Sequence, residues 1–215
     1  TRLFDLESGE IVASRDHDLT EPRILLSEDG RRLAILSTSS PVSGEVIEIG
    51  DDGEISVLLE LTVDDRAHRG RPLRFLDDGR RLVVAERSGA RIYDLETGTF
   101  ARLRENAKID THAVSLDGSL IAFGGEDFVS VWSVEPRERL ARIDGLERGP
   151  IAFAGPEGRT LVHRTRDAVS VLRWDPEALI EIACEIHAAD RWTGGRLRLS
   201  GGGEPRCAPA PLARR

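Results

Sequence analysis

The most constraining feature of this chain is a motif that recurs about every 40 residues: an apolar segment, an acidic turn ending in glycine, and a second apolar segment. The turn glycines are 49, 39 and 40 residues apart, at Gly30, Gly79, Gly118 and Gly158. Glycine adopts a positive φ without penalty and aspartate tolerates it, so an Asp-Gly pair between apolar segments predicts a tight hairpin. Four copies of the motif therefore predict an all-β chain.

Two further segments complete each repeat. A strand with an aromatic residue near its end is expected at 91–94, 129–133 and 169–175, and residues 3–5 match the same position. A final strand is expected at 10–14, 55–61, 99–103 and 140–143, and a longer loop, Ser37 to Gly44, explains the long first step. A period near 40 is the length of one propeller blade. The expected fold is a β-propeller of four-stranded antiparallel blades, about four in number, preceded by a half blade.

Residues 1–175 resemble the WD-repeat family through this recurring strand, Asp-Gly turn and strand, followed by an apolar strand that ends in an aromatic residue. The full Trp-Asp dipeptide occurs at Trp174-Asp175, whereas Trp132 is followed by serine and the Gly-His pair ahead of the first strand is absent. The resemblance implies structural roles in the blades for a small set of residues, namely Phe4, Tyr93, Trp132, Trp174 and the turn residue Asp127.

A different kind of segment follows Trp174. Asp175 can cap a helix that begins at Pro176, and the apolar spacing of the next residues predicts a helix over 176–190 that packs on the propeller. Residues 191–215 are rich in Gly, Pro and Arg and predict a flexible tail. This end resembles the C-terminus of bacterial WD-repeat proteins. Cys184 and Cys207 are either separate thiols or a disulfide, and their spacing suits no zinc motif.

We find no convincing catalytic or metal-binding constellation in the sequence. The histidines are not spaced as helical metal ligands, and no glycine-rich phosphate loop occurs, so neither a metal nor a cofactor is expected. Asp110 with His112, or His163 with Asp167, could orient a base, but no strained nucleophile turn accompanies them. The expectation is a protein that is not an enzyme.

The candidate binding residues are charged residues of the hairpin turns on one rim. Paired arginines follow two of the turn glycines at equivalent positions, where they could recognise an acidic partner. The full set is Asp29, Arg31, Arg32, Asp78, Arg80, Arg81 and Asp117, together with the loop from Thr38 to Gly44.

The sequence favours a non-catalytic protein-binding scaffold or sensor arm of a larger bacterial signalling protein, because WD-repeat propellers usually accompany a signalling part. The alternative is part of a propeller enzyme whose active site lies in the central channel. A net charge of −8 with interleaved signs argues against nucleic acid, and the short apolar runs argue against a membrane span. The absence of Met predicts that the chain starts inside a longer polypeptide. The expected partners are a protein or peptide and the N-terminal remainder of the same protein, in the cytoplasm.

Overall fold

The computed structural model describes residues 2–4, 7–16, 19, 21–37, 42–51, 53–63, 72–155 and 158–175, and all of its regular elements are β-strands. The strands form five antiparallel sheets, numbered I to V here in chain order. The helix predicted at 176–190 and the tail predicted at 191–215, with Cys184 and Cys207, lie outside the described residues.

Each sheet is a meander in which consecutive strands are neighbours. Sheet I contains β1 (Arg2–Phe4) and β2 (Ile11–Ser14). Sheet II contains β3 (Pro22–Leu26), β4 (Arg32–Ser37), β5 (Val42–Ile49) and β6 (Ile55–Val63). Sheet III contains β7 (Pro72–Leu76), β8 (Arg81–Glu86), β9 (Gly89–Asp94) and β10 (Phe100–Arg104). Sheet IV contains β11 (Thr111–Val114), β12 (Leu120–Gly124), β13 (Phe128–Ser133) and β14 (Arg139–Asp144). Sheet V contains β15 (Ile151–Ala154), β16 (Thr160–Arg164) and β17 (Val169–Arg173).

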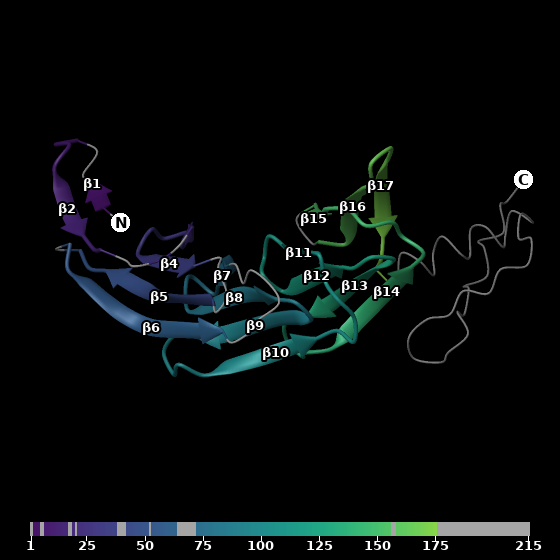
Figure 1. The fold of residues 1–215 in the computed structure, drawn as a ribbon, viewed down its shortest axis with the longest axis horizontal. Helices are drawn as coiled ribbons and strands as arrows, with labels where there is room; N and C mark the ends of the chain where they lie inside the picture. The colour runs from purple at the N-terminus through teal and green to yellow at the C-terminus, as the bar shows by residue number, and fades with distance from the viewer. Residues whose placement is uncertain are drawn as a thin grey trace, which may run out of the picture.

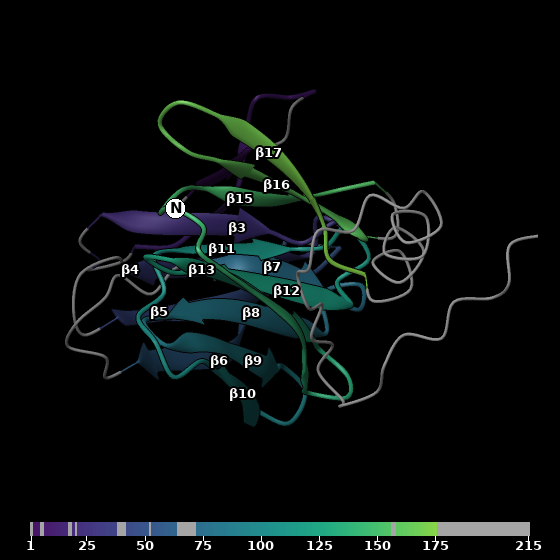
Figure 2. The ribbon, with the colours of Figure 1, turned by 90° about the vertical axis from the view of Figure 1, so that its right-hand side faces the viewer.

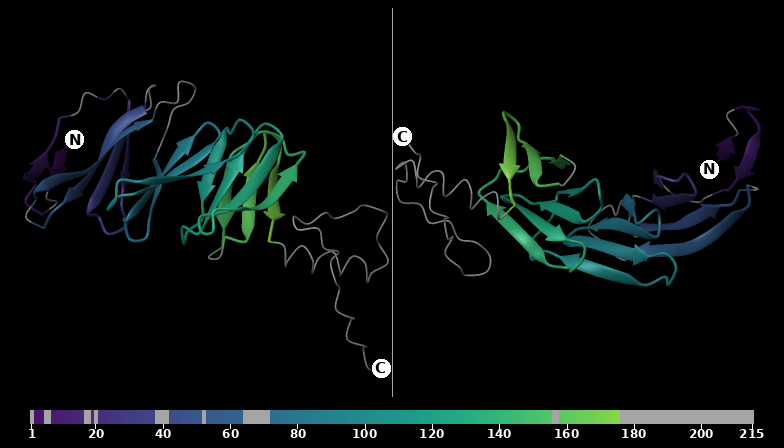
Figure 3. Two further views of the ribbon diagram at one scale, coloured as in Figure 1. Left: turned by 90° about the horizontal axis from the view of Figure 1, so that it is seen from below. Right: turned by 180° about the vertical axis from the view of Figure 1, so that it is seen from behind.

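The five sheets follow one another along an open arc (Figure 1). The first strands of the sheets, such as β7 and β11, lie on the concave side, and the last strands β6, β10 and β14 line the convex side (Figures 1 and 2). Views from below and from behind show the same side-by-side order of the sheets from the N-terminus to β17 (Figure 3). The repeat predicted from the turn glycines is therefore confirmed as a β-propeller-like series of sheets, with three complete four-stranded sheets.

The predicted long loop from Ser37 to Gly44 is wrong in its second half. Strand β5 already begins at Val42, and Gly44 pairs with Leu36 on β4 and Leu61 on β6. A Cβ at Gly44 would lie 2.0 Å from the carbonyl oxygen of Ile35, so this position in the sheet requires glycine. The extra length of the first repeat lies mostly in the strands β5 and β6, which have eight and nine residues.

The apolar core is divided into layers, each lying between two neighbouring sheets. Between sheets II and III, for example, Leu36 and Val46 of the earlier sheet pack with Leu82 and Tyr93 of the later sheet, all at most 4% exposed. Equivalent layers join sheets III with IV and IV with V. Burying one such side chain stabilises the fold by about 1.5–3 kcal/mol. Stability is therefore distributed over the interfaces between sheets.

The turn glycines add a second kind of contact between neighbouring sheets. A Cβ built at Gly118, where φ is +74°, would lie 2.7 Å from Cδ2 of Leu76 in the preceding sheet. Gly79 and Gly158 also lie against side chains of the sheet before them. Gly30, with φ +73°, has nothing within 4 Å. Each hairpin turn in sheets III to V therefore covers part of the sheet before it.

The two ends of the arc expose side chains that are buried elsewhere in the repeat. Val171 in sheet V is 68% exposed, whereas Val46, Ile92 and Val131 at the equivalent register positions are at most 5% exposed. At the other end, Phe4 on β1 is 50% exposed, whereas Tyr93 at the equivalent position of sheet III is 4% exposed. These outer faces have the same apolar character as the interfaces that the neighbouring sheets bury.

Candidate functional surface

All seven predicted binding residues lie in the turns between the first and second strands of sheets II, III and IV or at the first position of the second strand, as Arg32 and Arg81 do. Because these turns join equivalent strands, they lie at the same end of successive sheets. Two of the aspartates stabilise their own turns. The Asp29 carboxylate accepts hydrogen bonds from the Ser27 hydroxyl at 2.5 Å and from the backbone N–H of Arg31 at 3.0 Å. These bonds, the hydroxyl bond first, hold the pKa of Asp29 below its ordinary value.

Asp117 plays the same role in the β11–β12 turn. Its carboxylate accepts bonds from the Ser115 hydroxyl at 2.6 Å, the Ser119 hydroxyl at 2.8 Å and the Ser119 backbone N–H at 3.1 Å. The Ser115 hydroxyl is the largest cause of the lowered pKa of Asp117. Both aspartates are ionised near neutral pH and shape the turn, which is the usual role of an aspartate in this position.

The four predicted arginines form ion pairs within the chain. Arg31 lies 2.8 Å from Asp51, and Arg32 lies 3.1 Å from Glu48. Arg80 lies 3.1 Å from Glu96, and Arg81 bridges Asp77 to Glu135 of the next sheet. The side chains of Arg31 and Arg80 are 60% and 55% exposed, whereas those of Arg32 and Arg81 are 20% exposed. Arg31 and Arg80 are therefore the two that a partner could reach, and Arg32 and Arg81 contribute mainly to packing.

Asp78 differs from the other two turn aspartates. Both it and Asp77 have a left-handed backbone, with φ of 51° and 50°, and Gly79 follows at 91°. Such residues carry backbone strain of about 1–2 kcal/mol each. Within the described part of the chain, the Asp78 side chain makes no hydrogen bond or ion pair, so its carboxylate is available to solvent or to a partner.

Two adjoining hollows lie at this end of the inner strands. The larger, about 440 Å³, is mostly apolar and is lined by Leu25, Leu26, Glu28, Leu73, Arg74, Phe75, His112, Ala113, Val114 and Leu116. The smaller, about 240 Å³, is lined by Glu28, Arg74, Phe75, Leu76, Asp77, Asp78, Gly79, Leu116, Asp117 and Gly118. Four residues line both, so the hollows form one continuous depression, called the turn groove below. Sequence reasoning found its aspartates but missed Leu116 and Arg74, because only the stacking of sheets brings them together.

The residues expected to have structural roles occupy different positions. Tyr93 is 4% exposed and Trp132 packs in the next layer, and the register places the two at equivalent positions. Trp174 was expected at the same position, but the register places Leu172 there. Trp174 lies beyond β17, is 4% exposed, and donates a 2.9 Å hydrogen bond to the Gly158 carbonyl. Phe4, at the start of the arc, is 50% exposed.

Asp127 contributes to its turn through the backbone. Its carbonyl oxygen accepts hydrogen bonds from the N–H groups of Gly145, at 2.7 Å, and Leu146, at 3.1 Å. The bonds connect the turn between β12 and β13 to the segment that leaves β14.

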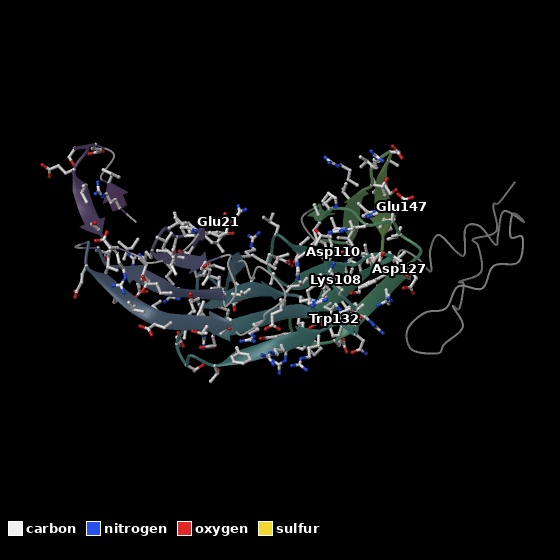
Figure 4. The ribbon with its side chains drawn as sticks, viewed as in Figure 1. Glu21, Lys108, Asp110, Asp127, Trp132 and Glu147 are labelled. Carbon is white, nitrogen blue, oxygen red and sulfur yellow. The ribbon has the colours of Figure 1, made fainter. Side chains whose placement is uncertain are left out.

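A buried carboxylate, which the sequence analysis did not identify, organises sheet IV. Glu105 lies between β10 and β11, its side chain is 1% exposed, and its Oε2 accepts bonds from the Ser130 hydroxyl at 2.6 Å and from Nε1 of Trp132 at 3.1 Å. Its Oε1 accepts bonds from Arg139 at 3.0 Å and Arg142 at 3.2 Å. This network fixes Trp132 (Figure 4) and ties sheet IV to the connection from sheet III. No sequence spacing signals it, because its five members come from three separate segments.

The suggested histidine-aspartate pairs are not formed by the groups expected. Asp110 pairs with Lys108 at 3.2 Å and with Arg148 at 3.3 Å (Figure 4). Nε2 of His112 lies 3.0 Å from the Gly89 carbonyl oxygen. His163 is 1% exposed in the layer between sheets IV and V. Among the described residues, no group of three or more His, Cys, Asp or Glu side chains could hold a metal ion.

Comparisons with known proteins identify the fold. No protein-family model matches the chain, and no curated protein matches it. A solved structure that matches is hydrazine synthase from Kuenenia stuttgartiensis, a β-propeller-containing protein, with a TM-score of 0.51 and 16% sequence identity. The match covers 79% of this chain and 63% of that chain, so this chain corresponds to less than two thirds of the other's length.

The sheets and this match together define the class: the chain has a β-propeller-like all-β fold. At this level of identity the similarity extends to the fold alone. In the described part of the chain there is no helix of the length and apolar character needed to cross a bilayer.

Proposed function

We propose that this chain is a segment of a WD-repeat propeller and serves as a non-catalytic scaffold that binds a protein or peptide partner in the bacterial cytoplasm. The WD-repeat assignment is supported by the repeat and by the network around Trp132. Glu105 lies ahead of the first strand of its sheet, where the resemblance would place a histidine, and it receives the bonds from Ser130 and Trp132. A carboxylate therefore takes the histidine's place in this sheet.

The observation that carries the binding function is the turn groove. Three consecutive sheets place charged and apolar side chains around one depression, as a recognition surface requires. The exposed guanidinium groups of Arg31 and Arg80 extend the surface beyond the groove. A scaffold of this kind needs no reacting group, so the proposal includes that the protein is not an enzyme.

The test uses the full chain as bait. Proteins captured from a bacterial extract would be identified and then measured one by one against the purified chain. We expect a partner whose binding weakens when the turn-end residue Arg31 or Arg80 is changed to Glu. Arg166, an exposed residue of the β16–β17 turn at the opposite end of the strands, provides the matched control as Arg166→Glu. Equal effects of all three substitutions would refute the placement of the binding surface.

We also propose that the remainder of the same protein supplies blades that cover the ends of the arc. Val171 and Phe4 are exposed where equivalent side chains in the middle of the arc are buried. Covering such residues is favourable by about 25 cal/mol per Å² of apolar surface. A longer form of the protein that contains flanking segments should therefore unfold at a higher temperature than this chain. An unchanged unfolding temperature would contradict the proposal.

A further inference from the structure

We propose that the turn groove binds a partner segment in which an apolar side chain is followed directly by a basic one. This inference rests on the proposed binding function and specifies its ligand. The groove has an apolar part, between Phe75 and Leu116, and an acidic part, beside Asp78 and Asp117. The occupant is a segment of another protein.

Leu116 supports the apolar part of this assignment. Its side chain lies in the β11–β12 turn and is 67% exposed. The register of the hairpins makes it equivalent to Glu28 and Asp77, which occupy the same position in the two preceding turns. Two turns accept a solvated carboxylate here, so the fold does not require an apolar residue. An exposed leucine beside a depression with a phenylalanine floor is a surface suited to an apolar side chain.

The charge balance supports the acidic part. Among the residues that the structure describes, four carboxylates line the smaller hollow and Arg74 is the one cation that lines it with them. Arg74 is paired with Glu28, and Asp77 is paired with Arg81 from outside the hollow. Asp78 and Asp117 have no cationic partner in the described part of the chain, and the lowered pKa of Asp117 keeps it ionised. A basic side chain at this position supplies the missing positive charge.

The apolar and acidic parts of the turn groove are adjacent. Their adjacency determines how close together the apolar and basic side chains of the ligand must be. Leu116 lines both hollows, and Asp117 follows it in the same turn. Consecutive Cα atoms are about 3.8 Å apart, so a partner segment that bends at this pair, rather than one that is fully extended, brings both side chains to the groove together. A single apolar-basic pair is therefore the shortest ligand that uses the whole groove.

The test is direct peptide binding to the full chain, measured by fluorescence anisotropy. Four labelled octapeptides of Gly and Ser would differ only in their two central residues: Leu-Arg, Leu-Glu, Ser-Arg or Ser-Glu. We expect Leu-Arg to bind about tenfold more tightly than Leu-Glu at low salt, with the difference shrinking as salt is added. Asp78→Asn should reduce this preference to about threefold, since one exposed charge contributes little more than that. Asparagine tolerates the left-handed backbone at position 78, so this variant should fold.

Leu116→Ser should weaken both leucine peptides by about fivefold and leave Ser-Arg unchanged. Asp167→Asn removes an exposed carboxylate from the β16–β17 turn, at the opposite end of the strands from the turn groove, and should change nothing. Equal binding of the four peptides, or a preference for Leu-Arg that is as large in Asp78→Asn as in the unchanged chain, would overturn the assignment. A protein partner that depends on Arg31 and Arg80 but not on Asp78 would also overturn it, while leaving the scaffold function intact.

Discussion

Replacing Glu105 with alanine should destabilise the protein more than any surface substitution. Its side chain is 1% exposed and receives hydrogen bonds from Ser130, Trp132, Arg139 and Arg142. Removing one partner of a buried charged network costs about 3–5 kcal/mol, because the remaining polar groups stay buried without a bond. The Ser130 residue is 0% exposed, so water cannot replace the lost acceptor without opening the layer.

The expected loss of stability can be divided between the exposed and the buried partners of Glu105. The side chains of Arg139 and Arg142 are 45% and 29% exposed and can be rehydrated after the substitution. The hydroxyl of Ser130 cannot, because Ser130 is 0% exposed, and leaving it without an acceptor costs about 1–3 kcal/mol. The indole N–H of Trp132 keeps only its longer bond, 3.3 Å, to the Ser130 hydroxyl. Glu105→Gln keeps the size of the side chain and one acceptor oxygen, so it should cost about half as much as Glu105→Ala.

The assay is equilibrium unfolding in urea followed by far-ultraviolet circular dichroism. With a slope of about 2 kcal/mol per molar urea, Glu105→Ala should lower the midpoint by roughly 1.5–2.5 M. Glu147→Ala, at an exposed glutamate near the same sheet, should change the free energy of unfolding by less than about 0.5 kcal/mol. A loss below about 1 kcal/mol in Glu105→Ala would refute the reasoning, because the carboxylate would then not hold the layer together.

Three further outcomes follow from the turns. Gly118→Ala should lower the free energy of unfolding in urea by at least about 1 kcal/mol more than Gly30→Ala does. The two glycines have nearly the same positive φ, but only Gly118 lies against the preceding sheet. Equal losses would contradict that contact. The pKa of Asp117 is lowered from its ordinary value of 3.8, so its stabilising effect is present above that pH and is lost as the pH falls through the lower folded-state pKa. Asp117→Asn should therefore be less stable than the wild type near neutral pH and should converge with it in strong acid, whereas a constant difference would refute the assignment. Trp174→Phe should lose about 1 kcal/mol with its hydrogen bond to Gly158, and an unchanged thermal midpoint would argue against that bond.

Local pattern predicted most strands of the sheets. The Asp-Gly turns located the first hairpin of each sheet, and the recurring aromatic and closing segments placed the other predicted strands within a few residues of their observed bounds, but β5 was not predicted. The end of the first loop was wrong because Gly44 has the sequence appearance of a turn residue, whereas the structure uses it for a close approach inside a sheet. Glycine serves both in turns and at close approaches inside a sheet, and only the position of the neighbouring strand distinguishes the two roles.

The functional surface was less accessible to sequence reasoning. The turn aspartates were found because they belong to the hairpin motif, but Leu116 became notable only when the register aligned it with Glu28 and Asp77. Glu105 was missed because its partners lie about 25 to 37 residues away along the chain. Trp174 was assigned to the aromatic position of the preceding repeats because it forms a Trp-Asp pair. The register places Leu172, two residues earlier, at that position.

The turn glycines of sheets III to V each lie against the sheet before them, and this overlap gives the arc a direction. All substantial packing in the described residues joins neighbouring sheets, so a lesion in one turn first loosens the sheet that precedes it in the chain. Local unfolding should therefore begin at one sheet and spread from each sheet to its neighbour along the arc. Amide protons of the middle sheets should then exchange most slowly, and a defect at Gly118 should speed exchange in β7 and β8 more than in β15 and β16.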